Sequence, residues 1–227
     1  MPRETLDRKI QHLRDEIIIL GSMVENATIN SVEALKKRDL ASARRIYAED
    51  NRINDKRFEL ENETITTIAT QQPIMARDLR LLASILEVAS ELERMGDYAK
   101  GIAKITLLIG DQPLVKPLID IPRMAQITAS MLHRAVGAFI SLDVETARLI
   151  PAEDDQVDDL YNQVYRELLM IMFSNPETID RANHLMWAAH NLERMADRVT
   201  NICERTIYAA TAEMKEFRAT DDEQISL

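Results

Sequence analysis

The sequence is poor in the residues that usually interrupt helices. Its 227 residues include five glycines, seven prolines, one tryptophan, five tyrosines and four phenylalanines, whereas Leu, Ile, Ala, Met, Glu and Arg are abundant. Most of these abundant side chains lose little rotamer freedom in a helix, so the composition favours helix. A hydrophobic content of 46% and a charged content of 29% are typical of a soluble globular protein. We therefore predict an all-α fold.

The chain also has few features of a secreted or membrane-spanning protein. Its single cysteine, Cys203, cannot form an internal disulfide, which fits a reducing cytoplasm. Because Cys203 follows Ile202 in a predicted helix, we expect a buried, unreactive thiol. No uncharged apolar run approaches the roughly 18 residues that a spanning helix needs, and the N-terminus leads into charged residues rather than a signal core. We expect a cytoplasmic protein that is peripheral to a membrane at most.

Basic residues are fewer than acidic residues. The chain has 28 Lys and Arg against 38 Asp and Glu, a formal net charge of −10, and the two signs are mixed along most of its length. Such a field repels nucleic acid and anionic membrane surfaces unless a basic face is segregated. We expect cations or basic protein surfaces as partners, and no nucleic acid.

Internal repetition is the strongest feature of the sequence. The motif Leu-Glu-Arg-Met-x-Asp occurs at Leu92–Asp97 and again at Leu192–Asp197, and the earlier segment Asp39–Asp50 matches Asp143–Asp154. Chance similarity between helical stretches seldom preserves several features in the same order. We predict two tandem three-helix bundles with six long helices, related by internal duplication: residues 1–110 form the first, 111–122 the linker, 123–217 the second and 218–227 an acidic tail.

Turn signals fall at matching places in the two units. Asp39 and Asp143 are predicted N-caps, and Pro73 and Pro176 each end a helix because the residue before proline avoids the α region. Gly110 is expected to end the third helix. The third helix of each unit carries apolar residues at alternating steps of three and four, which predicts a buried seam. The seam residues are Ile85, Val88, Leu92, Met95, Ala99 and Ile102 in the first unit, and Leu185, Ala188, Leu192, Met195, Val199 and Ile202 in the second.

Acidic residues recur four positions apart, a spacing that places both carboxylates on one helix face. Glu93 and Asp97 form such a pair in the first motif, and Glu193 and Asp197 in the second. Two adjacent carboxylates repel each other unless a cation lies between them. If the second and third helices of each unit are antiparallel, a further pair faces each motif. The predicted metal ligands are Asp50, Asn54, Glu93 and Asp97 in the first unit, and Asp154, Asp158, Glu193 and Asp197 in the second.

Donor chemistry and charge refine this prediction. Oxygen-only ligands suit hard or borderline cations such as Mg²⁺, Ca²⁺, Mn²⁺ or iron. Because Asn54 takes the place of a carboxylate, we predict tighter metal binding in the second unit. The register of the second-helix pair stays open, since a rival set lies one residue later, rotated by about 100° around the helix. That rival set is Asn51, Asp55, Asp155 and Asp159.

Other interpretations apply to these acids and to the nearby histidines. The acids can also be surface residues that are balanced by Arg94, Arg194 and Arg198. His184 and His190 flank the approach to the second motif, although a helix-surface or core-edge histidine is the more common case. The sequence has no Glu-x-x-His pair, no Gly-x-Ser-x-Gly motif and no P-loop. We therefore assign no catalytic residue and expect a protein that is not an enzyme.

Several further segments occur together with the duplicated motif. They are Gln72-Pro73 followed by Asp78-Leu79-Arg80, then Asn201-Ile202-Cys203-Glu204, and the Ala-Glu-Asp segments at Ala48–Asp50 and Ala152–Asp154. In this combination, and over nearly its whole length, the chain resembles the PhoU family, cytoplasmic regulators of bacterial phosphate uptake and signalling.

The resemblance implies a fold, a metal and a set of partners. It implies two three-helix bundles with pseudo-twofold symmetry, whose Glu/Asp-x-x-x-Asp motifs hold multinuclear clusters, often of iron or zinc. It further implies a negative regulator that couples the Pst phosphate ABC transporter ATPase to a membrane sensor histidine kinase and keeps phosphate-starvation genes off in adequate phosphate. Homodimers are common in the family. Four signature residues are expected to serve in partner binding or in structure: Asp78, Arg80, Arg94 and Arg194.

Two alternatives stand beside this expectation. One is a metal-dependent hydrolase or metal-storage helical bundle, which needs an open coordination position with a base beside it. The other is a helical scaffold without metal.

Overall fold

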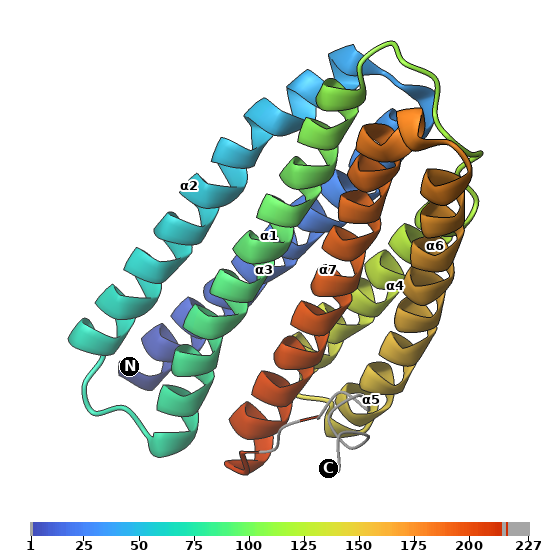
Figure 1. The fold of residues 1–227 in the computed structure, drawn as a ribbon. Helices are drawn as coiled ribbons and strands as arrows, with labels where there is room; N and C mark the ends of the chain where they lie inside the picture. Colours follow the sequence, from blue (N-terminus) through green and yellow to red (C-terminus); the bar gives the residue numbers. More distant parts are fainter. Residues whose placement is uncertain (1, 215–216, 218–227) are drawn as a thin grey trace.

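The protein is built from long helices, and the computed structural model describes residues 2–214 and residue 217 (Figure 1). In the first unit, α1 spans Pro2–Lys37, α2 spans Leu40–Thr70 and α3 spans Ala76–Ile109. In the second unit, α4 spans Asp120–Ser141, α5 spans Val144–Leu149, α6 spans Asp154–Ser174 and α7 spans Ile179–Thr211. The described residues contain no strand, and the all-α prediction of two three-helix units is confirmed.

The first turn of each unit repeats the same local structure. Arg38 and Leu142 adopt left-handed backbone angles, with φ of 55° and 56°, directly after the first helix of their unit. The next residue caps the following helix: the Asp39 carboxylate accepts hydrogen bonds from two main-chain amides, and the Asp143 carboxylate accepts one from the amide three residues later. Both predicted N-caps are confirmed, and their capping bonds satisfy amides that have no partner within the helix.

The middle helix of the second unit is interrupted, whereas the sequence analysis predicts one long helix there. It consists of α5, a 3₁₀ turn at Ile150–Glu153 and α6. Pro151 stands in this turn, at the position that Tyr47 holds in the first unit. Proline has no amide hydrogen to donate, and its ring clashes with the carbonyl four residues earlier, so a regular α-helix does not continue through it. The interruption makes Asp154 the first residue of α6.

Two helix ends in the second unit differ from the predicted boundaries. Because α4 begins at Asp120, its first residues fall within the predicted linker 111–122. α7 ends at Thr211 rather than near residue 217, because Ala212 adopts a left-handed conformation with φ of 67°. The predicted acidic tail 218–227 lies outside the described residues. The ends of α2, α3 and α6 fall beside their predicted signals, Pro73, Gly110 and Pro176.

One large hydrophobic core runs through both units, and a small separate cluster lies in the first. α3 and α7 pack side by side along the middle of the molecule, and α1 packs against α4 (Figure 1). Every predicted seam residue, from Ile85 to Ile102 on α3 and from Leu185 to Ile202 on α7, is buried. The two seams belong to one continuous cluster of buried side chains. The units are therefore joined by a shared core as well as by the linker.

Two features of the composition are reflected in the fold. Cys203 is buried in the core, as predicted, and burial raises the pKa of its thiol to about 12. The thiol is therefore protonated at neutral pH and a poor nucleophile. Among the described helices, none is both long and apolar enough to cross a membrane.

Candidate metal-binding site

The predicted metal ligands lie in two clusters, one in each unit. The first acidic site lies on α2 and α3, and the second acidic site lies on α6 and α7. In each site, carboxyl groups on the two helices are close enough to repel each other. The charge of Asp50 contributes to a raised pKa of Glu93, and the charge of Glu193 contributes to a raised pKa of Asp154. The first acidic site comprises Asp50, Asn54, Glu93 and Asp97, and the second comprises Asp154, Asp158, Glu193 and Asp197.

Burial settles the register that the sequence leaves open. Asp50 is buried, with 3% of its surface exposed, and Asn54, Asp154 and Asp158 are partly buried beside the third helix of their unit. The rival set, one residue later along the helix, points to solvent: Asn51, Asp55, Asp155 and Asp159 are all exposed.

Two carboxyl groups of the second acidic site have strongly raised pKa values. Burial raises the pKa of Asp154 to about 7, and repulsion from Asp158, Asp197 and Glu193 adds to the effect. Burial likewise raises the pKa of Glu193 to about 7, again with a contribution from Asp197. Desolvation and like charge both penalise the ionised form. The second acidic site is thus a place where negative charge is poorly compensated.

Neighbouring basic residues neutralise only part of this charge. The Arg194 guanidinium donates a hydrogen bond to Asp197 Oδ2 at 2.9 Å. His190 Nδ1 lies 3.1 Å from Glu193 Oε2 without forming a hydrogen bond, and burial lowers the pKa of His190, which favours its neutral form. Asp154 Oδ1 and Glu193 Oε2 are both buried and accept no hydrogen bond. Such orphaned carboxylate oxygens are costly, and a bound cation would satisfy them.

The donor chemistry of the second acidic site suits a cation, although its side chains do not form a closed metal site. Carboxylate oxygens are the ligands that Mg²⁺, Ca²⁺ and Mn²⁺ prefer, and they also bind iron and zinc. Across residues 2–214, however, no three His, Cys, Asp or Glu side chains are grouped closely enough to hold one metal ion. Binding therefore requires the carboxylates to turn toward one another, which their mutual repulsion opposes until a cation is present.

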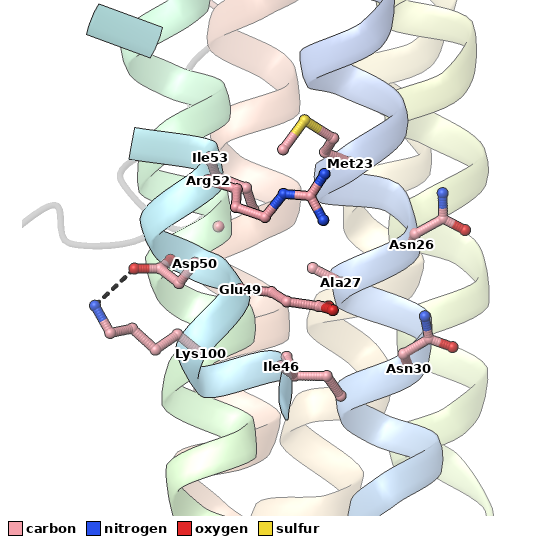
Figure 2. A pocket seen from close by; sticks show the side chains of 11 residues that line it. Met23, Asn26, Ala27, Asn30, Ile46, Glu49, Asp50, Arg52, Ile53 and Lys100 are labelled. Carbon is pink, nitrogen blue, oxygen red and sulfur yellow. Dashed lines mark hydrogen bonds and ion pairs between the residues drawn. The ribbon is translucent and has the colours of Figure 1, made fainter. Parts of the chain in front are cut away.

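The first acidic site contains a cation of its own (Figure 2). The Lys100 ammonium donates a hydrogen bond to Asp50 Oδ2 at 2.7 Å and lies 3.6 Å from Asp97 Oδ1. The Asn54 amide donates to the same Asp50 oxygen at 3.4 Å. The bond to Asp50 raises the pKa of Lys100, so the ammonium stays charged at neutral pH. Burial raises the pKa of Glu93, with a smaller contribution from Asp97.

Lys100 is a site residue that the spacing of the acids does not reveal. It stands three positions after Asp97 and therefore on the same face of α3. The matching position after Asp197 is Thr200, whose hydroxyl donates to the main-chain carbonyl of Asp197 at 2.7 Å. An alignment of the two repeats that extends beyond the motif places Lys100 opposite Thr200. This difference in charge is the sequence signal that could have identified the lysine.

A cavity of about 210 Å³ adjoins the first acidic site between α1, α2 and α3. In Figure 2, Glu49 and Arg52 point from α2 toward α1, whereas Asp50 and Lys100 lie on the other side of α2. The side chains that line the cavity include positive charges, negative charges and amides, so we assign the cavity no ligand. The polar side chains that line it are Asn26, Asn30, Glu49, Asp50, Arg52 and Lys100.

A larger cavity of about 660 Å³ lies between α3 and α7. His184 and Lys104 line it together with Trp187, which is 59% exposed. Of the two histidines considered as ligands, His184 therefore belongs to this cavity, and His190 is the one that approaches the second acidic site.

The signature residues make contacts that join or brace helices. Arg3 forms an ion pair with Asp78 and so links the start of α1 to the start of α3. Arg94 donates to Glu91 at 2.9 Å within α3. Arg80 is partly buried, and its Nε makes no hydrogen bond. These contacts favour a structural role for Asp78 and Arg94, and a role in partner binding stays a prediction.

The two copies of the motif meet where α3 and α7 cross. Arg198 Nη1 and Asn201 Nδ2 lie 3.4 and 3.2 Å from Glu91 Oε2, and Asn191 Nδ2 lies 3.4 Å from the carbonyl oxygen of Tyr98. Residues before one motif thus contact residues after the other, as antiparallel helices related by a pseudo-twofold axis require. Arg198 pairs with Glu91 here, rather than with the acids of the second motif.

Known proteins match this chain over both repeats. The family model described as the PhoU domain matches residues 17–106 and again residues 121–206. A relative from Clostridium acetobutylicum, named phosphate-specific transport system accessory protein PhoU homolog, is 34% identical over 93% of this chain and 96% of its own length. A relative of the same name from Rhizobium meliloti is 31% identical over 97% of this chain and 93% of its own length.

Solved structures share the fold. The crystal structure of the phosphate transport system regulatory protein PhoU from Streptococcus pneumoniae matches with a TM-score of 0.87 and 29% identity, covering 93% of this chain and 100% of that one. PhoU from Pseudomonas aeruginosa matches with a TM-score of 0.86 and 28% identity, covering 91% of this chain and 99% of that one. Sequence, internal repeat and fold agree, and the chain belongs to the PhoU family.

Proposed function

We propose that this chain is a non-enzymatic accessory protein of phosphate-specific transport and a negative regulator of phosphate uptake. The observation that carries the proposal is the match to relatives with that name over nearly the full length of both chains. Both repeats take part in the match, and these are the parts of the chain that carry the acidic sites. A regulator of this kind works through binding rather than through a chemical step.

The finer proposal is an adaptor at the cytoplasmic face of the membrane. In adequate phosphate, the protein couples the ATPase of the phosphate ABC transporter to a membrane sensor histidine kinase and keeps the phosphate-starvation genes off. The support for these two partners, and for a homodimer, is the resemblance to the PhoU family.

The second acidic site is the proposed metal site of this adaptor. Asp154, Asp158, Glu193 and Asp197 would hold the ion, with iron or zinc implied by the family resemblance and Mg²⁺, Mn²⁺ or Ca²⁺ also suited to oxygen ligands. When bound, the ion supplies positive charge to the carboxylates and a bridge between α6 and α7. The buried oxygens of Asp154 and Glu193 that accept no hydrogen bond support this assignment. Asp50 Oδ1 in the first acidic site is also buried without a hydrogen bond, but the other oxygen of Asp50 is bonded to Lys100.

Elemental analysis of the purified protein tests the metal proposal. We expect a transition metal in the wild-type chain and its loss when Glu193 and Asp197 are both changed to Ala, with retention of the helical circular-dichroism spectrum. Metal that persists in the double variant would argue against this site. A metal-dependent hydrolase, the main alternative, would show metal-dependent hydrolysis that is lost in the same variant.

Deletion of the gene in its own host tests the regulatory proposal. We expect a phosphate-starvation reporter to become active in phosphate-replete medium and to be silenced again by the wild-type gene on a plasmid. A pull-down from phosphate-replete cells should recover the transporter ATPase and the sensor kinase. Repression that survives the deletion would contradict the proposal.

A further inference from the structure

We infer that Lys100 is the resident cation of the first acidic site, so that this site takes no metal ion while the lysine is present. The inference deepens the proposed function, because it rests on the assignment of the family's acidic motif to metal binding. It departs from the family resemblance, which implies a metal cluster in each unit, and from our prediction that Asp50 and Asn54 are metal ligands.

The contacts of Asp50 carry the inference. Its side chain is 2% exposed, and the Lys100 ammonium is the charged group that compensates it, at 2.7 Å. The same ammonium lies 3.6 Å from Asp97, so one lysine contacts acids on both α2 and α3 and occupies the space between two of the four predicted metal ligands. A divalent cation at that place would be within a few ångströms of a charged ammonium and would be repelled by it.

Further contacts hold Lys100 in place. Its ammonium lies 5.6 Å from the centre of the Tyr47 ring, within the range of a cation–π interaction. Its side chain is only 29% exposed, so little of it is free to swing into solvent. Displacement of the lysine by a metal ion would break the bond to Asp50 and the ring contact together.

The second unit lacks both parts of this arrangement. Thr200 replaces Lys100, and Pro151 replaces Tyr47. The hydroxyl of Thr200 bonds to its own helix and carries no charge. Duplication therefore produced two similar acidic sites that differ in their basic residues. In the first, Lys100 reaches acids on both α2 and α3; in the second, Arg194 bonds to Asp197 within α7, and an uncharged threonine takes the place of Lys100.

Calorimetric titration of the metal-free, full-length protein with Mn²⁺ tests the inference. The background is the double variant Glu193→Gln/Asp197→Asn, in which the second acidic site is disabled. We expect this variant to bind no Mn²⁺. Addition of Lys100→Met should create Mn²⁺ binding that is tighter by about tenfold or more than the weakest binding the titration can detect, and a further Asp50→Asn change should abolish it.

Two controls make the result specific. Lys104→Met removes an exposed lysine one turn further along α3 and should create no Mn²⁺ binding. Lys100→Gln keeps a hydrogen-bond donor for Asp50 and serves if Lys100→Met does not fold, and it should also create binding.

The inference is overturned if the background variant, with Lys100 intact, binds Mn²⁺ at a site that Asp50→Asn removes. It is equally overturned if neither folded Lys100 variant gains binding. A different result would contradict the proposed metal site in the second unit. In that case the wild-type protein would bind no Mn²⁺, whatever the Lys100 variants do.

Discussion

At the scale of single residues, the two units satisfy the same buried carboxylate in different ways. In each unit one oxygen of this residue, Oδ1 of Asp50 or of Asp154, is buried without a hydrogen bond. The other oxygen of Asp50 accepts a hydrogen bond from Lys100 at 2.7 Å, whereas Thr200 takes the place of Lys100 in the second unit. Burial of a charge without a partner is costly, and the pKa of Asp154 rises to about 7 in response. The first site is therefore partly neutralised by a lysine of its own, and we expect the second to be stabilised further by protons or by a cation.

Removal of the Lys100 charge should destabilise the fold. Lys100→Met leaves the Asp50 carboxylate buried without its charged partner, and we expect the free energy of unfolding in urea to fall by about 1–3 kcal/mol. The double variant Asp50→Asn/Lys100→Met should recover part of the loss, because the unpaired charge is gone. A Lys104→Met control should change the free energy of unfolding by less than about 0.5 kcal/mol. Strictly additive effects of the two changes would show that the pair is not coupled.

The stability of the metal-free protein should fall as the pH rises. Unfolded Asp and Glu titrate near pH 4, whereas the pKa values of folded Asp154 and Glu193 are about 7. A raised carboxyl pKa means that the folded state holds its protons longer, so the stability these protons confer is complete below about pH 4 and is lost as pH rises toward about 7. Thermal unfolding in EDTA should therefore give a higher Tm at about pH 5 than at about pH 8.

The matched control removes both titrations. Asp154→Asn/Glu193→Gln replaces each carboxyl group with a neutral amide of similar shape, so the double variant should be more stable than the wild type at about pH 8, with a smaller dependence of Tm on pH. Identical pH profiles for the two proteins would refute the assignment of these shifts.

At the scale of helices, the two units pair side chains of different size where the second and third helices pack together. A methyl group added at Gly96 would lie 3.1 Å from Cγ2 of Ile53. The second unit has Val157 and Ala196 at these positions, a smaller side chain on one helix and a larger one on the other. The two pairs fill a similar space in different ways, which suits a close-packed interior.

The exchange of this pair is testable in a double-mutant cycle. Gly96→Ala gains helix propensity of about 1 kcal/mol but crowds Ile53, so its net effect on the free energy of unfolding should be small or unfavourable. Ile53→Val alone should cost about 0.5–1.5 kcal/mol. The double variant should be more stable than the sum of the single effects predicts, by about 0.5–1 kcal/mol in urea unfolding. A coupling of zero or of opposite sign would contradict the contact.

Much of this element-scale structure is readable from the sequence, because its signals are local. Asp39 and Asp143 cap helices as predicted, and the breaks at Pro73 and Pro176 follow from the chemistry of proline. Pro151 carries an equally local signal, and it interrupts a helix that the repeat alignment predicts as continuous. Repeat symmetry outweighed a residue-level rule there, and the rule was correct.

The parts of the site that sequence could not give depend on geometry between helices. Spacing alone allows either Asp154 with Asp158 or Asp155 with Asp159 to face α7. The rotation of α6 about its own axis decides between the two pairs. The role of Lys100 depends on a contact to Asp50 on another helix, 50 positions away in the chain. Neither fact is encoded in a local pattern.

At the scale of the whole molecule, the two units pack against each other, and we expect them to unfold cooperatively. α3 and α7 pack against each other, and most of the buried hydrophobic residues of both units form one continuous cluster. A unit taken alone would lose the contact between α3 and α7 and the part of the core that the two units share. Both acidic sites lie on helices that contribute to this shared core, so we expect an ion bound in one unit to stabilise both units against unfolding.

Truncation of the central methionines should reveal this cooperativity. Met95 and Met195 are both fully buried, and replacing either with Ala should lower the free energy of unfolding by about 2–5 kcal/mol. Both variants should shift one single unfolding transition, followed by circular dichroism and by Trp187 fluorescence. Met170→Ala, at a position that is 66% exposed, serves as the control and should have little effect. Two separate transitions in either core variant would mean that the units unfold independently.

We infer that duplication left one acidic site closed by Lys100 and the other open to a metal ion. An anomalous difference map from crystals grown with Mn²⁺ tests it most directly. We expect a peak between α6 and α7, within coordination distance of Asp154 and Glu193, and no peak at the first acidic site, where Lys100 should remain on Asp50. A peak at Asp50 and Glu93 with the lysine displaced, or equal peaks at both sites, would contradict the claim.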